Sequence, residues 1–214
     1  MPQNEKGKSV KKQISTKTKN PQIVKEKQEL IIQVASELFS KKGYHRASLR
    51  DISAASGINL GYIYNYISSK DDILYLFYQI FQEKWSHLYE NLSESKDENP
   101  IDQLKSLIES MLPIMHELSD FVLALYTEGR HLKKESLHSV LEEESKMIRQ
   151  LEELIVRGVN QGLFETEDTF FSANIIQYLI HIYPLKRWNL RHRYSNKQFS
   201  ELLTNHIFSI LGVK

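Results

Sequence analysis

The chain has 214 residues, of which 41% are hydrophobic and 26% charged, a composition typical of a soluble globular protein of one or two domains. It has no cysteine, which excludes a disulfide framework, a zinc ribbon and a thiol nucleophile and fits a reducing cytoplasm. No stretch approaches the roughly 18 apolar residues of a membrane span, and no apolar segment follows the basic N-terminus, so we expect neither a membrane anchor nor a secretory signal.

Charge is distributed unevenly along the chain. Residues 1–70 contain 13 Lys and Arg against 5 Asp and Glu, whereas the remaining residues contain 15 against 22. A basic N-terminal part on an acidic body indicates binding to a polyanion, although a solvated basic tail would give the same counts. Residues 1–24 are rich in Lys and small polar residues and nearly free of large apolar ones, which predicts a disordered basic arm closed by Pro21.

Helical periodicity follows this arm and predicts three short helical segments over residues 25–72. The first ends at Gly43. The second is capped by Ser48, with Asp51 three residues later as a capping box, and ends at Gly57. The third covers about residues 59–67. Small residues lie where the second and third segments touch, so residues 25–72 are predicted to form a helix-turn-helix domain whose last helix enters the major groove of DNA.

The outward side chains of the third segment suit contacts with DNA. Tyrosine hydroxyls and lysine can donate to phosphates, asparagine can pair with adenine, and a glycine such as Gly61 lets the backbone approach closely. The alternative is that the tyrosines pack within the small domain. We expect at most one of Tyr62, Tyr64 and Tyr66 to be fully buried.

All long segments beyond residue 72 are predicted to be helical, and no alternating strand pattern competes, so the fold class is all-α. Ser68 and Ser69 cap a long helix, and Pro113 is expected to kink or end a later one. A helix over 135–160 is expected to stop at Gly162, and a single helix is expected over 166–188. Ser195 with Gln198 forms a capping box before the last helix.

Residues 25–75 resemble the TetR family of transcriptional regulators. The resemblance is carried by Ile31 to Phe39 with Gly43 and Tyr44, Ser48 to Ile52, Ala55 to Ile58, and most specifically Gly61 to Ile67 followed by Ser69 to Leu74. Ser53 and Tyr66 depart from the commonest residues at their positions. The resemblance implies a DNA-contacting set in which Ser48, Tyr64 and Lys70 hold phosphates: Arg46, Ser48, Arg50, Asn59, Leu60, Gly61, Tyr62, Tyr64, Asn65, Tyr66 and Lys70.

The same resemblance implies a ligand-responsive regulator, usually a repressor, with a ligand-binding and dimerisation domain over residues 73–214. Its last two helices and their symmetry mates would form a four-helix dimer interface. A two-fold homodimer also suits a palindromic operator, because its two recognition helices lie about one DNA turn apart.

The effector is predicted to be a small lipophilic molecule. Residues suited to an apolar cavity, for which ordinary core packing is the alternative, are Met111, Met115, Phe121, Leu125, Tyr126, Tyr178 and Trp188. Two features stand out in the C-terminal half: Glu128 to Leu132 followed by Glu142 to Glu144, and Tyr183 to Trp188 followed by Arg191 to Tyr194. With these features the C-terminal half is similar to TetR-family repressors of fatty-acid and sterol degradation, which respond to acyl-CoA thioesters. This similarity implies that cations meet the CoA phosphates, although a solvated basic loop is the alternative: Lys186, Arg187, Arg191 and Arg193.

The sequence leaves three alternative functions. The chain could regulate drug efflux or another gene through a different lipophilic ligand, or bind DNA without any ligand. Glu128-x-x-His131 and Glu135-x-x-His138 match the pattern of di-metal helical bundles, but both pairs fall close together in sequence and cannot easily converge. With no catalytic or nucleotide-binding motif present, we expect no enzyme activity, no metal and no cofactor.

Overall fold

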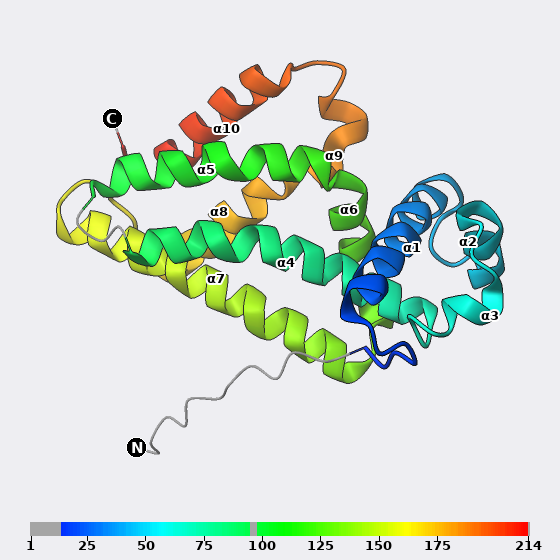
Figure 1. The fold of residues 1–214 in the computed structure, drawn as a ribbon. Helices are drawn as coiled ribbons and strands as arrows, with labels where there is room; N and C mark the ends of the chain where they lie inside the picture. The colour runs from blue at the N-terminus through cyan, green and yellow to red at the C-terminus, as the bar shows by residue number, and fades with distance from the viewer. Residues whose placement is uncertain (1–13, 95–97, 214) are drawn as a thin grey trace. The chain divides into compact units, whose positions relative to one another are not determined.

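The computed structural model describes residues 14–94 and 98–213, and within this part the secondary structure is entirely helical (Figure 1). The helices are α1 (Pro21–Lys42), α2 (Leu49–Ser56), α3 (Leu60–Ile63), α4 (Lys70–Glu94), α5 (Pro100–Glu117), α6 (Ser119–Glu128), the 3₁₀ helix η1 (Gly129–His131), α7 (Lys134–Asn160), α8 (Thr169–Ile180), α9 (Ile182–Leu190) and α10 (Asn196–Ile210). The predicted all-α class is confirmed. None of the helices described is both long and apolar enough to cross a membrane.

The chain divides into two compact units. The first contains the residues up to Phe77 together with Thr127–Glu143, and the second contains Tyr78–Tyr126 with Glu144–Lys214. The helices α4 and α7 therefore each contribute to both units. The first unit extends beyond the predicted domain of residues 25–72, because the start of α4 and the segment around η1 pack with it.

The N-terminal helix α1 begins earlier than predicted. Asn20 caps it by accepting the backbone N–H groups of Gln22 and Ile23, and Pro21 occupies the first helical position. Proline is favoured there because its fixed φ suits a helix and its missing N–H would have no partner. Pro21 therefore starts the helix and does not close an arm. Residues 1–13 of the predicted arm lie outside the described residues.

The helices α2 and α3 follow the predicted pattern with one difference in length. The capping box of Ser48 and Asp51 is present, and Gly57 ends α2 with a φ of 68° that a side chain would strain. The helix α3 covers only Leu60–Ile63, since residues 64–66 continue as turns. Figure 1 shows α1, α2 and α3 as the blue to cyan group at the N-terminal end of the chain.

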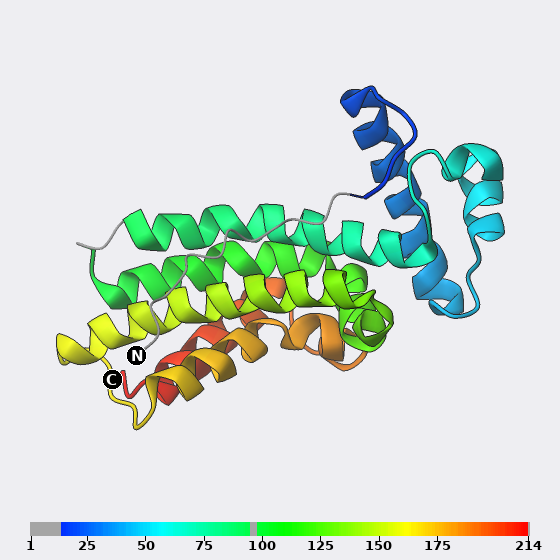
Figure 2. The same cartoon turned by 90° about the horizontal axis from the view of Figure 1, so that it is seen from below.

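The second unit is a bundle with an extensive apolar core. Helix α5 contacts α8, α9 and α10, and α8 also contacts α9 and α10. Figures 1 and 2 show α5, α8, α10 and the later parts of α4 and α7 running side by side. Large side chains with almost no exposure fill the centre, among them Trp85, Leu104, Ile108, Met111 and Leu151.

Helix boundaries in this unit differ from the sequence prediction at two places. Helix α5 does not end at Pro113. A proline inside a helix frees the carbonyl four residues earlier, here that of Glu109. Because Pro113 and Glu109 are both exposed, water can satisfy this carbonyl. The predicted helix over 166–188 is instead two helices that meet at His181. In a continuous helix the ring of Pro184 would collide with the carbonyl of Ile180, so the chain restarts at Ile182 and places Pro184 in a first turn.

Candidate DNA-binding surface and effector site

The start of α2 is fixed by a compact set of polar contacts. The Asp51 carboxylate accepts the Ser48 hydroxyl at 2.6 Å, the Ser48 backbone N–H at 2.8 Å and the Lys42 ammonium at 3.0 Å. These hydrogen bonds lower the pKa of the Asp51 carboxyl, with the contacts to Ser48 acting most strongly. Ser48, Arg46 and Arg50 all remain exposed, and the Arg46 guanidinium donates to the carbonyl of Lys42.

The helix α3 presents aromatic side chains outward on a fixed support. Ile63 is fully buried beneath it, and the Asn59 side chain caps it by accepting the Gly61 N–H at 2.9 Å. Tyr62 is 63% exposed and Tyr64 is 43% exposed, whereas Leu60 is half-buried. Two large aromatic side chains held outward on a short, anchored helix form a surface suited to the grooves and phosphates of DNA.

The residues after α3 differ in their exposure. Tyr66 is only 7% exposed, which does not favour a contact with DNA. Residues three and four positions apart share a face, which places Tyr66 and Ile67 on the buried side with Ile63. The expectation that at most one of the three tyrosines is buried is confirmed. The half-buried Asn65 accepts the backbone N–H of Lys17 through its carbonyl at 2.9 Å, so the segment before α1 adjoins this turn.

The Lys70 ammonium makes two hydrogen bonds within the protein. Its ammonium donates to the carbonyls of Tyr44 at 2.7 Å and Ala47 at 3.0 Å, and it lies 4.1 Å from the centre of the Tyr44 ring. Burial lowers the pKa of this amine. The Tyr44 hydroxyl in turn donates to Asp71 at 2.8 Å. Lys70 therefore holds the loop between α1 and α2, and one ammonium N–H is left beyond these two bonds.

The residues predicted to line an effector cavity differ in their burial. Met111 and Met115 are fully buried core residues, and Phe121 and Leu125 are partly buried. Tyr126, Tyr178 and Trp188 are 45%, 52% and 69% exposed. Trp188, on the short helix α9, therefore faces outward, and its contact with an effector stays a prediction.

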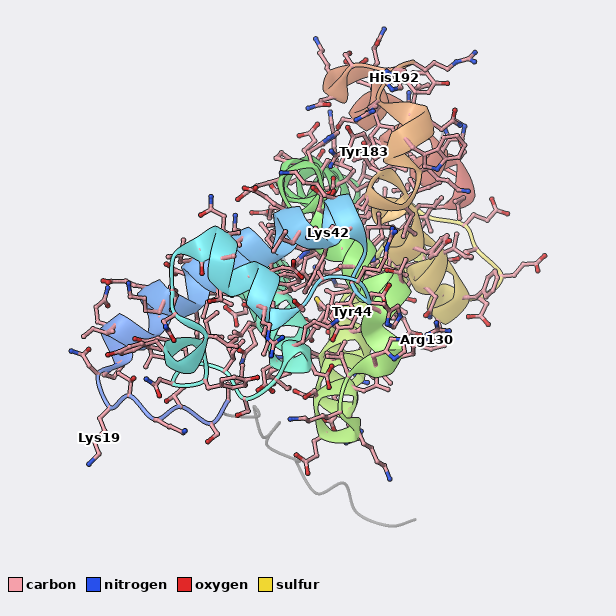
Figure 3. The ribbon with its side chains drawn as sticks, turned by 90° about the vertical axis from the view of Figure 1, so that its right-hand side faces the viewer. Lys19, Lys42, Tyr44, Arg130, Tyr183 and His192 are labelled. Atoms are coloured by element: carbon pink, nitrogen blue, oxygen red, sulfur yellow. The ribbon has the colours of Figure 1, made fainter. Side chains whose placement is uncertain are left out.

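The predicted cations are spread over α9 and the turn after it. Arg187 forms an ion pair with Asp120 at 3.2 Å, and the Arg191 guanidinium donates to the His192 ring at 3.0 Å. Lys186, Arg191 and Arg193 are exposed, and Figure 3 shows His192 at the outer end of this region among other side chains that point to solvent. These groups form an exposed basic surface.

Four buried polar residues of the second unit were missed by sequence reasoning. Trp85, Tyr89, Gln177 and His181, here named the buried polar cluster, are each at most 4% exposed. The Tyr89 hydroxyl donates to the Gln177 carbonyl oxygen at 2.7 Å, and the Tyr126 hydroxyl lies 2.8 Å from His181 Nδ1. Trp85 Nε1, Gln177 Nε2 and His181 Nε2 are buried without a hydrogen-bond partner. Unpaired buried polar atoms are uncommon and mark a place for a ligand or water.

Physical chemistry of the cluster follows from this burial. Burial lowers the pKa of His181 to about 4 and raises the pKa values of the Tyr89 and Tyr126 hydroxyls. His181 is therefore neutral near pH 7 and has one N–H. The signal in the sequence is the spacing: Trp85 and Tyr89, and Gln177 and His181, are each four residues apart, so the two members of each pair lie on one helix face.

The outer faces of α8 and α10 carry exposed apolar side chains. On α8 these are Phe170, Phe171 and Tyr178, and on α10 they are Leu202 and Ile210. The two helices contact one another. Phe171 and Ile210 also line an open hollow of about 510 Å³ with Glu165, Thr166, Glu167, Asp168 and Ser172, none of which was predicted to bind a ligand.

Comparisons with known proteins bear on both halves of the chain. Residues 31–75 match the family model described as bacterial regulatory proteins of the tetR family, and residues 97–183 match a tetracyclin repressor-like C-terminal domain. The transcriptional regulator HbdR of Aromatoleum sp. is 23% identical over 85% of this chain and 79% of its own length. The transcriptional repressor KstR2 of Mycobacterium tuberculosis is 21% identical over 64% of this chain and 68% of its own length.

Solved structures show the same fold. The structure of AibR in complex with isovaleryl coenzyme A and operator DNA has a TM-score of 0.73 at 18% identity, over 85% of this chain and 97% of that one. The ketosteroid regulator KstR2 of Mycobacterium tuberculosis has a TM-score of 0.70 at 15% identity, over 94% and 97% of the two chains.

The two family models together match more than half of the chain, and they meet the helix-turn-helix and the helical bundle that the structure places there. The chain therefore belongs to the tetR family of bacterial regulatory proteins and is a ligand-responsive, DNA-binding transcriptional regulator.

Proposed function

We propose that this chain is a repressor that binds a palindromic operator as a homodimer and releases it when an acyl-CoA binds the second unit. The observation that carries the DNA-binding part is the outward display of Tyr62 and Tyr64 on the anchored helix α3. The relatives named above are regulators, which supports a regulator and not an enzyme, acting on DNA in the bacterial cytoplasm.

The proposed DNA-contacting set follows the exposure of each residue. Tyr62 and Gly61 face the bases, with Leu60, Asn59 and Asn65 beside them, and Tyr64 donates to a phosphate. The exposed residues Arg46, Ser48 and Arg50 add backbone contacts. Lys70 contributes its remaining N–H and otherwise positions the loop before α2. Tyr66 is omitted, because its ring is buried.

The dimer is proposed to form through α8 and α10. Phe171 and Tyr178 lie seven residues apart and so share one face of α8, and their rings are 64% and 52% exposed. Burying them against a second copy removes apolar surface from water, which favours association. Light scattering should give a mass near twice that of the 25.1 kDa chain, and Phe171→Glu with Tyr178→Glu should give the monomer.

The acyl-CoA effector rests on two features of the second unit. The buried polar cluster offers N–H groups without partners: Trp85 Nε1 and Gln177 Nε2 are donors, and His181 Nε2 becomes one when the Tyr126 hydroxyl donates to Nδ1. Such groups suit an acceptor such as a thioester carbonyl, in surroundings that suit an acyl chain. Lys186, Arg191 and Arg193 supply exposed cations for CoA phosphates.

Relatives support this class of effector. AibR was solved with isovaleryl coenzyme A, and a fatty acid metabolism regulator of Bacillus subtilis is 24% identical over 62% of this chain. The test is a thermal-shift series with acyl-CoAs of several lengths, free CoA and free fatty acids, followed by release of a DNA duplex selected from a random library. The proposal is supported if acyl-CoA, but neither free CoA nor free fatty acids, raises the melting temperature and releases the DNA.

The same series separates the alternatives. A response to free fatty acids, or to cationic lipophiles added to the series, but not to acyl-CoA would replace the effector with another lipophilic ligand. Loss of the acyl-CoA response on changing Lys186, Arg191 and Arg193 to Glu, with DNA binding retained, would assign these cations to the CoA phosphates. An unchanged response in that variant would exclude this role.

A further inference from the structure

A group of two histidines and a glutamate, none of them in the proposed DNA-contacting set, lies in the first unit. His45 belongs to the turn between α1 and α2, Glu128 is the last residue of α6, and His131 is the last residue of η1. One nitrogen of each imidazole and one oxygen of the carboxylate all lie within 4.8 Å of one another. Figure 3 labels their chain neighbours Tyr44 and Arg130 in this part of the molecule.

The distances converge on a single carboxylate oxygen. Oε2 of Glu128 lies 3.2 Å from Nε2 of His45 and 3.9 Å from Nε2 of His131. The rings of His45 and His131 meet edge to face, with centroids 4.7 Å apart. The cluster thus brings His45 to Glu128 and His131, which lie three residues apart in a distant segment of the sequence, and its closest polar atoms are of the kinds that bind metal ions.

The carboxylate oxygen is the least satisfied atom of the cluster. The Glu128 side chain is only 16% exposed, and its Oε2 is buried without a hydrogen-bond partner. A buried anionic oxygen without a hydrogen bond is costly unless a cation or a metal ion compensates it. The nearby ammonium of Lys70 is already committed to the carbonyls of Tyr44 and Ala47.

We propose that His45, Glu128 and His131 bind one divalent transition-metal ion of the Zn²⁺ type. Imidazole and carboxylate groups bind zinc at about 2.0–2.2 Å, so two ligand atoms in a tetrahedral site lie about 3.4 Å apart. The observed 3.2 and 3.9 Å bracket this value. Two imidazoles among three ligands favour zinc over Ca²⁺ or Mg²⁺, which prefer oxygen ligands.

The exposure of the three side chains leaves room for a fourth ligand. His45 is 62% exposed and His131 is 36% exposed, so an ion can enter from solvent and keep a water molecule. One side chain competes with the metal, because the Arg130 guanidinium donates to Nε2 of His131 at 3.2 Å. Arg130 is exposed and can turn away, and its removal should strengthen binding.

The proposed site differs from the di-metal site that the two Glu-x-x-His patterns of the sequence would form. His138 pairs with Glu142 at 3.3 Å on the surface of α7 and does not join the cluster. The third ligand, His45, comes instead from the loop that Lys70 holds at the start of α2. A bound ion would therefore join this loop to the segment around η1 within the first unit, and should stabilise that unit by mass action.

The test is a zinc titration of the full-length protein, after removal of metal by chelation, in competition with a chromophoric chelator. We expect one ion per chain and a rise in melting temperature. His45→Ala and Glu128→Gln should each weaken binding by more than about tenfold. The matched control is His138→Ala, which removes a surface histidine that also pairs with a glutamate and should leave the affinity unchanged.

Two further results decide the proposal. Arg130→Ala should bind zinc more tightly than the unchanged protein, and Co²⁺ should give a visible spectrum of a tetrahedral site that His45→Ala abolishes. If His45→Ala and Glu128→Gln bind zinc as tightly as His138→Ala, binding at scattered surface histidines explains the titration and the proposal is overturned. Because His45 is exposed, its variant should fold even if the Glu128 variant does not.

Discussion

The polar groups of the α2–α3 segment and those of the helical bundle are satisfied over different distances. At the start of α2, Ser48 and Asp51 satisfy one another within three residues, and Asn59 caps α3 two residues away. In the bundle, the Tyr89 hydroxyl reaches Gln177, and Tyr126 reaches His181. In the first region Tyr62 and Tyr64 face outward, so this region suits a polyanion. In the bundle, donors of the buried polar cluster remain without partners, so this region suits an enclosed ligand.

The largest expected effect tests the outward tyrosines. Changing Tyr62 and Tyr64 together to Phe removes two hydroxyls proposed to meet DNA but keeps both rings. A hydrogen bond contributes about 1.5–3 kcal/mol when its partner is a charged phosphate, as proposed for Tyr64, and about 0.5–1.5 kcal/mol when its partner is a neutral base, as proposed for Tyr62. DNA affinity should therefore fall at least about 30-fold in a fluorescence anisotropy titration. Tyr66→Phe is the matched control, since this buried ring should leave DNA affinity unchanged. A loss of DNA affinity in Tyr66→Phe as large as that in the double variant would contradict the assignment.

The buried polar cluster should make stability depend on pH. His181 has a folded-state pKa of about 4 against 6.5 for the free side chain, so the unfolded chain binds the proton more readily between these values. The free energy of unfolding should therefore decrease as pH falls from about 6.5 to 4, by up to roughly 3 kcal/mol. Chemical denaturation at several pH values measures this dependence.

The variant His181→Phe sharpens that measurement. It should remove most of the loss of stability at acidic pH and leave the smaller contribution of His116. The pKa of His116 is lowered mainly by burial and to a smaller extent by the charge of Arg187. The same variant should bind DNA as the unchanged protein does. A pH dependence identical in His181→Phe would mean that other groups cause it.

Packing within the bundle gives an effect of intermediate size. A Cβ added at Gly158 would overlap the ring of Phe164, whereas one added at Gly129 meets no atom within 4 Å. Gly158→Ala should destabilise the protein by about 1–3 kcal/mol, since overfilling a core forces side chains to move. Gly129→Ala should change the melting temperature little. An unaffected Gly158→Ala variant would show that Phe164 moves without cost.

The smallest effect compares two equivalent helix caps. Ser48 begins α2 and Ser195 begins α10, each with a complete capping box. Changing either serine to Ala should cost about 1 kcal/mol of stability. Only Ser48→Ala should also weaken DNA binding, because it alone lies beside the proposed DNA surface. The comparison fails if Ser195→Ala weakens DNA binding as much.

Features that depend on a few consecutive residues were predictable from the sequence. The caps at Ser48 and Ser195 and the stops at Gly43 and Gly57 were found where expected. The burial of Tyr66 was not predictable, because the pattern does not tell which of the three tyrosines shares the face of Ile63. The cluster of Trp85, Tyr89, Gln177 and His181 could not be assembled in advance, since its helices meet only through the tertiary fold. His45 approaches Glu128 for the same reason.

The anchoring of α3 has a consequence for how such a regulator can change its target. The buried side chain of Ile63 anchors the helix to the core, and Asn59 caps its start. The turn after the helix is held by the Gln28 side chain, which donates to the carbonyl of Tyr66 at 2.9 Å. Of these, Ile63 and Gln28 lie away from the outward side chains. Replacing Tyr62 or Tyr64 should therefore alter which sequence is recognised without altering whether the domain folds. Selection could thus redirect the protein to new genes through a few mutations while stability remains under separate control.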